Sequence, residues 1–288
     1  MTMPSTTVEI VERHRTELLR ARRGRGLLFV GVLIVLVIVS GYMGEVSLQK
    51  LVTGLPRFFN YIWRTLPELS WATLSADLGR WFWALERWLW LLFDTILIAF
   101  VATAIGVVLA FFLSFPAARN LTPNLFVFQI TRRFLEFMRT VPELVFALFF
   151  VFAFGLGAMA GVLAIALHTV GVLGKLFSEI NETVSPRTLD GVVAAGASRD
   201  QVIRLGVVPQ VIPAFVSYTL LRFEINVRSA SVIGFVGAGG IGQELMFVIN
   251  QFIYRDISAI LFLIVVCVAV IDIGCERIRH RMIDGQVA

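Results

Sequence analysis

The sequence predicts an all-α integral membrane protein with about six transmembrane helices and both termini in the cytoplasm. Its 288 residues are 58% hydrophobic and 16% charged, with a mean hydropathy of +0.84. A soluble domain has about 45–50% apolar and about 25% charged residues. The apolar residues form long uncharged runs, and basic residues gather between alternate runs. This composition excludes a disordered chain and argues against a free-standing soluble enzyme.

Six apolar runs can supply the spans, since a bilayer crossing takes about 20 residues. We expect the spans at residues 27–43, 90–113, 134–155, 161–177, 207–233 and 257–275. The third and fourth share an uncharged run of 31 residues, 144–174, which is too long for one comfortable span. We therefore expect the third to start upstream, to kink at Pro142 and to turn at the glycines of 155–161.

The basic residues predict the orientation. With six spans and the N-terminus inside, 17 of the 25 Lys and Arg fall in cytoplasmic segments, six fall outside and two lie within a span. This bias follows the positive-inside rule. Counting residues 144–174 as one span would instead place the basic C-terminal end outside. We expect a multi-pass protein of the inner (plasma) membrane.

The N-terminal third combines three parts. Residues 1–89 hold an Arg-rich tail, a retained anchor helix and a Trp-rich segment, and residues 90–281 form one transmembrane domain. All six tryptophans lie at positions 63–90. Because amphipathic rings favour the membrane interface, we expect this segment to lie along the outer surface. A partner-docking surface is the alternative.

The cytoplasmic segment between the fourth and fifth spans predicts a helix, a bend and a second helix. Ser185 suits the N-cap of a helix that begins at Pro186, and Gly196 suits the left-handed residue that ends it. Ser198 and Gln201 stand at capping-box spacing and open the second helix.

The second helix is expected to stop at Gly206, before Pro209 starts the next span. Small Ala and Gly residues, with Val192 and Ile203 exposed, would suit insertion into a groove of a partner protein.

This segment resembles a known family. Asp190-Gly191-Val192, Gly196 and Val208-Pro209 are similar to the EAA loop of bacterial ABC-importer permeases, where Glu-Ala-Ala, a glycine and Leu-Pro stand at this spacing. Asp190 replaces Glu, Gly191 replaces the first Ala and Val208 replaces Leu. Residues 222–230 and 237–245 resemble more narrowly the permease of phosphonate importers, as do 167–169 and 174–179. The resemblance covers residues 90–281.

The resemblance implies the permease subunit of a type I, binding-protein-dependent ABC importer that carries phosphonate, phosphate or phosphite inward. The implied partners are a second permease copy, a cytoplasmic ABC ATPase dimer and an extracytoplasmic substrate-binding protein; a homodimer is favoured over a heterodimer with a sister permease. The implied ATPase-coupling residues are Asp190, Gly191, Val192, Gly196, Ser198, Gln201, Val208 and Pro209.

The chain itself is not expected to bind ATP. It has no Gly-x-x-x-x-Gly-Lys-Ser/Thr loop, so ATP and Mg are expected on the partner ATPase and no cofactor or nucleic acid on this chain. No catalytic or metal-ligand constellation stands out, which argues against an enzyme. An ATP-independent carrier or channel for a small anion is the alternative function.

Charged residues inside the fifth span are candidates for the translocation pathway. Each Arg at mid-membrane costs about 2.5–3.5 kcal/mol, so Arg222, Glu224 and Arg228 must face protein or water. Two interpretations stay open: an ion network that holds helices together, or arginine donors for a passing oxyanion, with Asn226 and Ser229 as lesser candidates.

A glycine cluster follows the fifth span. Residues 237–242 fit the dinucleotide fingerprint Gly-x-Gly-x-x-Gly, but spans flank them where a strand and helix are needed. We expect Gly237, Gly239, Gly240 and Gly242 to form a tight extracytoplasmic bend where backbones approach closely, either across a dimer or near the substrate's entrance.

Overall fold

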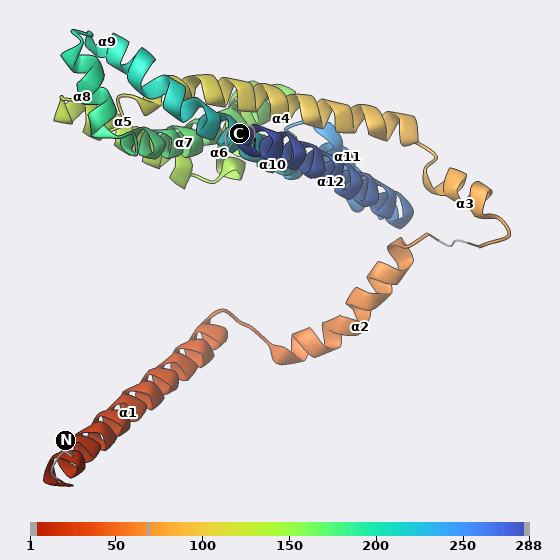
Figure 1. Ribbon diagram of the computed structural model, residues 1–288. Coiled ribbons are helices and arrows are strands. Elements are labelled where there is room, and N and C mark those ends of the chain that lie inside the picture. The colour runs from red at the N-terminus through yellow and green to blue at the C-terminus, as the bar shows by residue number, and fades with distance from the viewer. Residues whose placement is uncertain (1–4, 68–69, 285–288) are drawn as a thin grey trace. The chain divides into compact units, whose positions relative to one another are not determined.

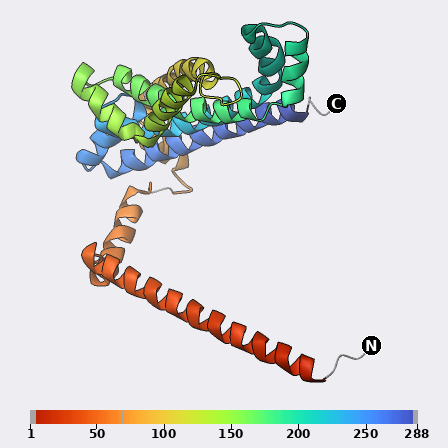
Figure 2. The same ribbon diagram turned by 90° about the vertical axis from the view of Figure 1, so that its left-hand side faces the viewer.

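A computed structural model of the chain describes residues 5–67 and 70–284 (Figures 1 and 2), and every regular element in them is helical. Contacts divide the chain into two units, Met1–Trp63 and Arg64–Ala288. The helices are α1 (Ser5–Met43), α2 (Leu48–Thr65), α3 (Leu74–Trp81), α4 (Leu85–Ser114), α5 (Leu125–Thr140), α6 (Glu143–Phe154), α7 (Ala158–Glu182), α8 (Pro186–Ala194), α9 (Arg199–Gln201), α10 (Val208–Ile233), α11 (Gly240–Asn250) and α12 (Tyr254–Asp284).

The first unit consists of α1 and most of α2. The part of α1 from Arg22 to Met43 is long and apolar enough to cross a membrane, and it contains the expected span 27–43. Its side chains are exposed apart from Gly41, which is partly covered. An apolar, unburied helix of this length is what a lipid-facing anchor requires.

In the second unit, α7 lies at the centre and contacts α4, α5, α6 and α10. Its buried side chains are mostly small, among them Ala164, Thr169, Gly171 and Ser178. A Cβ added to Gly106 of α4 would lie 2.5 Å from the Thr169 methyl group, so α4 and α7 approach closely at this glycine. Close packing of small residues is how helices associate inside a membrane, where lipid gives no hydrophobic driving force between them.

The span count agrees with the predicted architecture. Among residues 5–67 and 70–284, five helices are candidate spans, and α5 with α6 forms a bent pair that brings the count to six if it crosses as one unit. The spans expected at 207–233 and 257–275 lie within α10 and α12, apart from Val207, which precedes α10.

The third span, expected to kink at Pro142, is a pair of helices broken at that point. The chain breaks between α5 and α6 with an 88° bend, much sharper than the predicted kink at Pro142. Val141 is extended, with φ −72° and ψ 123°, because a proline disfavours helical backbone in the residue before it. The 12 residues of α6 reach only about 18 Å, too short to cross a bilayer alone.

Part of the Trp-rich segment packs inside the second unit. Trp81 donates a hydrogen bond to Ser258 (3.0 Å), Trp83 donates to Asp256 (3.2 Å), and Trp88 is buried. These contacts hold the start of α12 at the end of the bundle opposite α8 and α9 (Figure 1). An interfacial position for the segment stays a prediction.

Candidate functional site

The helix–bend–helix segment begins as the sequence predicts. Ser185 is extended at the N-cap, Pro186 is the first residue of α8, and Gly196 is left-handed with φ 86°. At the bend the backbone N–H of Ser198 donates to Gln201 Oε1 (2.7 Å), and the predicted capping box is present.

The second helix does not stop at Gly206, so this prediction is wrong. A π-helical turn, Val202–Val207, follows α9 and leads directly into α10. Pro209 lies in the first turn of α10, directly after the π-helical turn, and the Gln210 side chain donates to the Gly206 carbonyl (2.5 Å). Residues Arg199–Val236 therefore form one continuous helical path from the bend into the bundle.

The helix–bend–helix segment, residues 185–207, forms an α8–α9 hairpin. Its exposed surface differs from the expectation. Val192 and Ile203, expected to be exposed, are half-buried, whereas Val193 and Leu205 are exposed. Val192 is half-buried because α8 folds back against the π-helical turn, where it lies beside Gly206. Its neighbours Asp190 and Gly191 are exposed on α8, and Val208 is half-buried at the start of α10.

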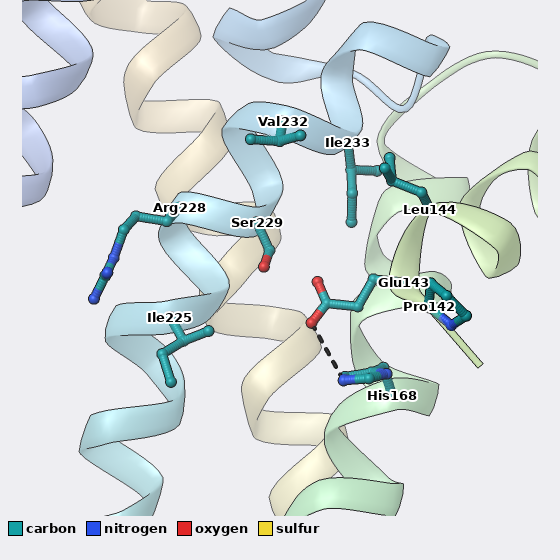
Figure 3. A pocket seen from close by; sticks show the side chains of 9 residues that line it. All are labelled: Pro142, Glu143, Leu144, His168, Ile225, Arg228, Ser229, Val232 and Ile233. Atoms are coloured by element: carbon teal, nitrogen blue, oxygen red, sulfur yellow. Dashed lines mark ion pairs between the residues drawn. The ribbon is translucent and has the colours of Figure 1, made fainter. Parts of the chain in front are cut away.

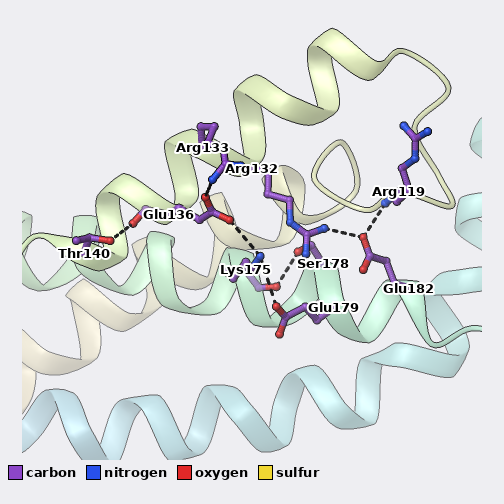
Figure 4. Close-up of polar contacts among 9 residues, drawn as sticks. All are labelled: Arg119, Arg132, Arg133, Glu136, Thr140, Lys175, Ser178, Glu179 and Glu182. Atoms are coloured by element: carbon purple, nitrogen blue, oxygen red, sulfur yellow. Dashed lines mark hydrogen bonds and ion pairs between the residues drawn. The ribbon is translucent and has the colours of Figure 1, made fainter.

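The hairpin is anchored to the rest of the bundle. Arg199 donates to the Leu121 carbonyl (2.6 Å), beside a cavity of about 590 Å³ between α8 and the α4–α5 connection. Nearby, Glu182 accepts from Arg132 (2.8 Å) and from the backbone N–H of Arg119 (2.9 Å), as Figure 4 shows. The end of α7, where the hairpin begins, is thus ion-paired to the middle of α5.

Lys175 joins α5 and α7 one turn further along. It lies 3.5 Å from Glu179, a spacing of four residues, and 3.4 Å from Glu136 of α5. Figure 4 shows both carboxylates on the Lys175 amine.

Arg222 and Asn226 lie in a buried polar cluster between helices. Arg222 Nη2 is 2.6 Å from Glu143 Oε1, and the Arg222 side chain is only 8% exposed. Asn226 donates to Thr103 of α4 (2.8 Å) and Thr169 of α7 (3.0 Å). These bonds tie α10 to α4, α6 and α7 in the interior of the bundle.

Arg228 belongs to a second, more exposed network. It lies 3.0 Å from Glu224, whose other oxygen is 3.3 Å from Arg279 of α12, and 4.0 Å from Asp272. The Arg228 side chain is 51% exposed. The two arginines of α10 therefore face different surroundings, as their angular separation of about 120° requires.

A cavity of about 430 Å³ opens beside α10. Its lining residues are Pro142, Glu143, Leu144, His168, Ile225, Arg228, Ser229, Val232 and Ile233. In Figure 3 the Ser229 hydroxyl and the Glu143 carboxylate point toward one another, whereas the Arg228 guanidinium points away from Glu143.

Sequence reasoning missed the position of Glu143 in this cavity. A carboxylate directly after the break at Pro142, at the first position of an apolar helix, is the signal that was available. His168 of α7 lies beside this carboxylate: its Nδ1 is 3.1 Å from the Val141 carbonyl, and its Nε2 is 3.6 Å from Glu143.

The glycine cluster forms a tight bend with close backbone approach, as the sequence predicts. Gly237, Gly239 and Gly240 have φ values of 85°, 87° and 70°. The Ile241 N–H donates to Thr95 Oγ1 of α4 (2.9 Å), and a Cβ on Gly242 would collide with the Ser231 carbonyl. No strand precedes the cluster in residues 70–236, so a dinucleotide fold is absent from this part of the chain.

Comparisons with known proteins point to one family. Residues 106–282 match the family described as "Binding-protein-dependent transport system inner membrane component". The phosphite transport system permease protein PtxC of Stutzerimonas stutzeri is 37% identical over 238 residues, which are 83% of this chain and 82% of that protein. The phosphate-import permease protein PhnE of Mycolicibacterium smegmatis is 37% identical over 191 residues, 66% of this chain and 36% of that protein.

A solved structure shares the fold. The MetNI methionine ABC transporter in an inward-facing conformation has a chain that superposes with a TM-score of 0.59 at 19% sequence identity, covering 69% of this chain and 96% of that chain.

Proposed function

The chain belongs to the family of binding-protein-dependent transport system inner membrane components, and we propose that its cargo is a phosphorus oxyanion. It is a permease subunit of an ATP-driven ABC importer and a multi-pass protein of the inner membrane. The cargo class is supported by relatives whose names specify phosphite and phosphate. Phosphonate, phosphite and phosphate share the charged tetrahedral oxygens that arginine binds.

The observation that carries the proposed pathway is the exposure of Arg228 beside the α10 cavity. A guanidinium that is half exposed within a span cannot face hydrocarbon, at a cost of about 2.5–3.5 kcal/mol, so it faces water or protein. We assign Arg228 and Ser229 to the pathway surface. Arg222 and Asn226 act behind it by fixing α10, and Glu224 orients Arg228.

A second copy of the chain completes this pathway. The surface of α10 around Arg228 and Val232 is left exposed by the single chain. A homodimer would place two such surfaces opposite one another and shield both arginines from lipid. Two facing arginines would also offer donors to both sides of a tetrahedral anion.

The α8–α9 hairpin is the proposed contact for the ABC ATPase dimer, which binds ATP and Mg. Its exposed Asp190, Gly191 and Val193 lie at the end of the bundle opposite α3 (Figure 1). Because α9 continues into α10, movement of the hairpin reaches the cavity through one helical path. The extracytoplasmic binding protein would then dock at the other end, beside the Gly237–Gly242 bend.

Reconstitution tests both the proposed cargo and the dependence of transport on the ATPase. The chain is co-expressed with its ATPase, purified as a complex and placed in vesicles with its binding protein. We expect phosphite, phosphate or methylphosphonate to stimulate ATP hydrolysis and sulfate to leave it at the basal rate. Equal stimulation by sulfate would contradict the proposal that the cargo is a phosphorus oxyanion. Uptake that continues without the ATPase would contradict ATP-driven transport.

A further inference from the structure

Helix α2 has two opposite faces. At 100° per residue, Leu51, Val52, Leu55, Phe58, Phe59 and Ile62 fall within an arc of about 120°. Lys50, Arg57 and Arg64 share a narrow stripe on the other side, and the helix contains no acidic residue. This separation is the pattern of a surface-seeking amphipathic helix.

The apolar face of α2 is built from large side chains. All six of its large side chains are exposed, with Phe59 64% and Val52 64% accessible. A row of large apolar side chains such as Leu51, Val52, Leu55, Phe58 and Phe59 favours an apolar environment over water. The partner must therefore be apolar on one side and compatible with cations on the other.

Helix α2 cannot itself cross a membrane. It carries three cations in 18 residues and does not qualify as a candidate span. Pro56 inside the helix has no N–H, so the Val52 carbonyl lacks its helical donor. Hydrocarbon could not satisfy that carbonyl, whereas the hydrated headgroup region can.

The chain keeps α2 close to a bilayer surface. Only residues 44–47 separate the end of α1 at Met43 from the start of α2 at Leu48. Such a link reaches at most about 18 Å. Gly44 donates back to the Ser40 carbonyl and Glu45 has φ 52°, so the chain turns as it leaves α1. If α1 spans the membrane, α2 starts at its surface.

From these observations we infer that α2 lies in the bilayer surface at the C-terminal end of α1. Its apolar face enters the boundary of the acyl chains, and Lys50, Arg57 and Arg64 lie among the headgroup phosphates. The occupant of this face is anionic lipid, which fits both the exposed apolar arc and the cations of the basic stripe. This inference does not depend on the cargo.

Spin labels on the full-length chain test the inference. Cys267 and Cys275 are first replaced by serine, and this background must retain uptake. Single cysteines are then introduced as Leu55→Cys and Phe59→Cys on the apolar face, and as Lys50→Cys and Arg57→Cys on the basic stripe. The labelled protein is placed in phosphatidylcholine–phosphatidylglycerol vesicles, and relaxation by oxygen is compared with relaxation by a water-soluble nickel complex.

We expect labels on the apolar face to favour oxygen by several-fold and labels on the basic stripe to favour nickel, with a helical period along α2. Nickel access at all four positions would place the helix in water and overturn the inference. Labels at Leu55 and Phe59 shielded from both reagents would also overturn it, because protein would then cover the face.

Discussion

Replacing Arg222 with alanine should destabilise the protein far more than replacing Arg228, although both lie on α10. The Arg222 side chain is 8% exposed and 2.6 Å from Glu143, whereas the Arg228 side chain is 51% exposed and 3.0 Å from Glu224. Removing one partner of a buried ion pair costs about 3–5 kcal/mol, because the other charge stays buried. Losing an exposed pair costs about 0–1 kcal/mol. We therefore expect the two variants to differ by at least about 2 kcal/mol.

Reversible unfolding in mixed micelles, followed by tryptophan fluorescence, measures this difference. A matched double variant, Arg222→Met with Glu143→Gln, removes both charges while keeping side-chain volume. It should recover most of the stability lost in Arg222→Ala, since the unpaired Glu143 carboxylate causes most of that loss.

Uptake in the same variants separates the two roles. We expect Arg228→Ala to reduce oxyanion uptake while its abundance in the membrane stays normal, because its side chain lines the cavity that we assign to the pathway. Arg222→Ala should lose uptake in proportion to lost folded protein. An Arg222→Ala protein as stable as wild type would refute the buried pair. Unchanged uptake in Arg228→Ala would refute its place in the pathway.

Three further predictions follow from local geometry. Gly240→Val should abolish assembly and uptake, because Gly240 has φ 70° and an added Cβ would collide with Thr95. Gly274→Ala is the control, since a Cβ at Gly274 meets open space. Immunoblots measure the amount of assembled protein in each variant, and transport assays measure its uptake. Gly191→Ala should stabilise α8 by up to about 1 kcal/mol. Nothing in the chain lies within 4 Å of a Cβ at Gly191, so the added methyl group disturbs no contact inside this subunit. If Gly191→Ala uncouples ATP hydrolysis from uptake, the ATPase contacts α8 at this residue. Normal coupling in this variant would count against that contact. Reporters active only in the cytoplasm should give signal at both termini, and a silent C-terminal fusion would contradict six spans.

Local signals in the sequence predicted local structure well. Hydropathy located the span of α10, and the residue types at Ser198, Gln201 and Gly196 predicted the capping box and the left-handed bend. These features depend on a few neighbouring residues and on backbone geometry that only certain side chains allow. Nothing in the rest of the chain had to be known.

The surroundings of each helix face were harder to predict. In a membrane, surfaces that face lipid and surfaces that face protein are both apolar, so hydrophobic periodicity does not separate them. The large Phe149 and Phe152 of α6 are exposed, while Ala164 and Gly171 of α7 are buried. Residue size therefore predicts better than hydrophobicity which helix faces are buried against protein. The helical repeat places Arg222 and Arg228 on different sides of α10, but only the position of Glu143 shows which of the two arginines is buried.

The hydrogen bonds and ion pair of α10 limit which helices can move when the α8–α9 hairpin is displaced. From Gln201 to Ser229 the helix runs about 42 Å, and between these ends Arg222 and Asn226 bind it to α4, α6 and α7. If α10 slid or rotated alone, it would break the Arg222–Glu143 ion pair and the hydrogen bonds from Asn226 to Thr103 and Thr169, a loss of several kcal/mol. The lower-energy movement carries α4, α6, α7 and α10 together as one block. In the proposed homodimer, opening and closing would then take place where that block meets a second copy, at the exposed surface that carries Arg228.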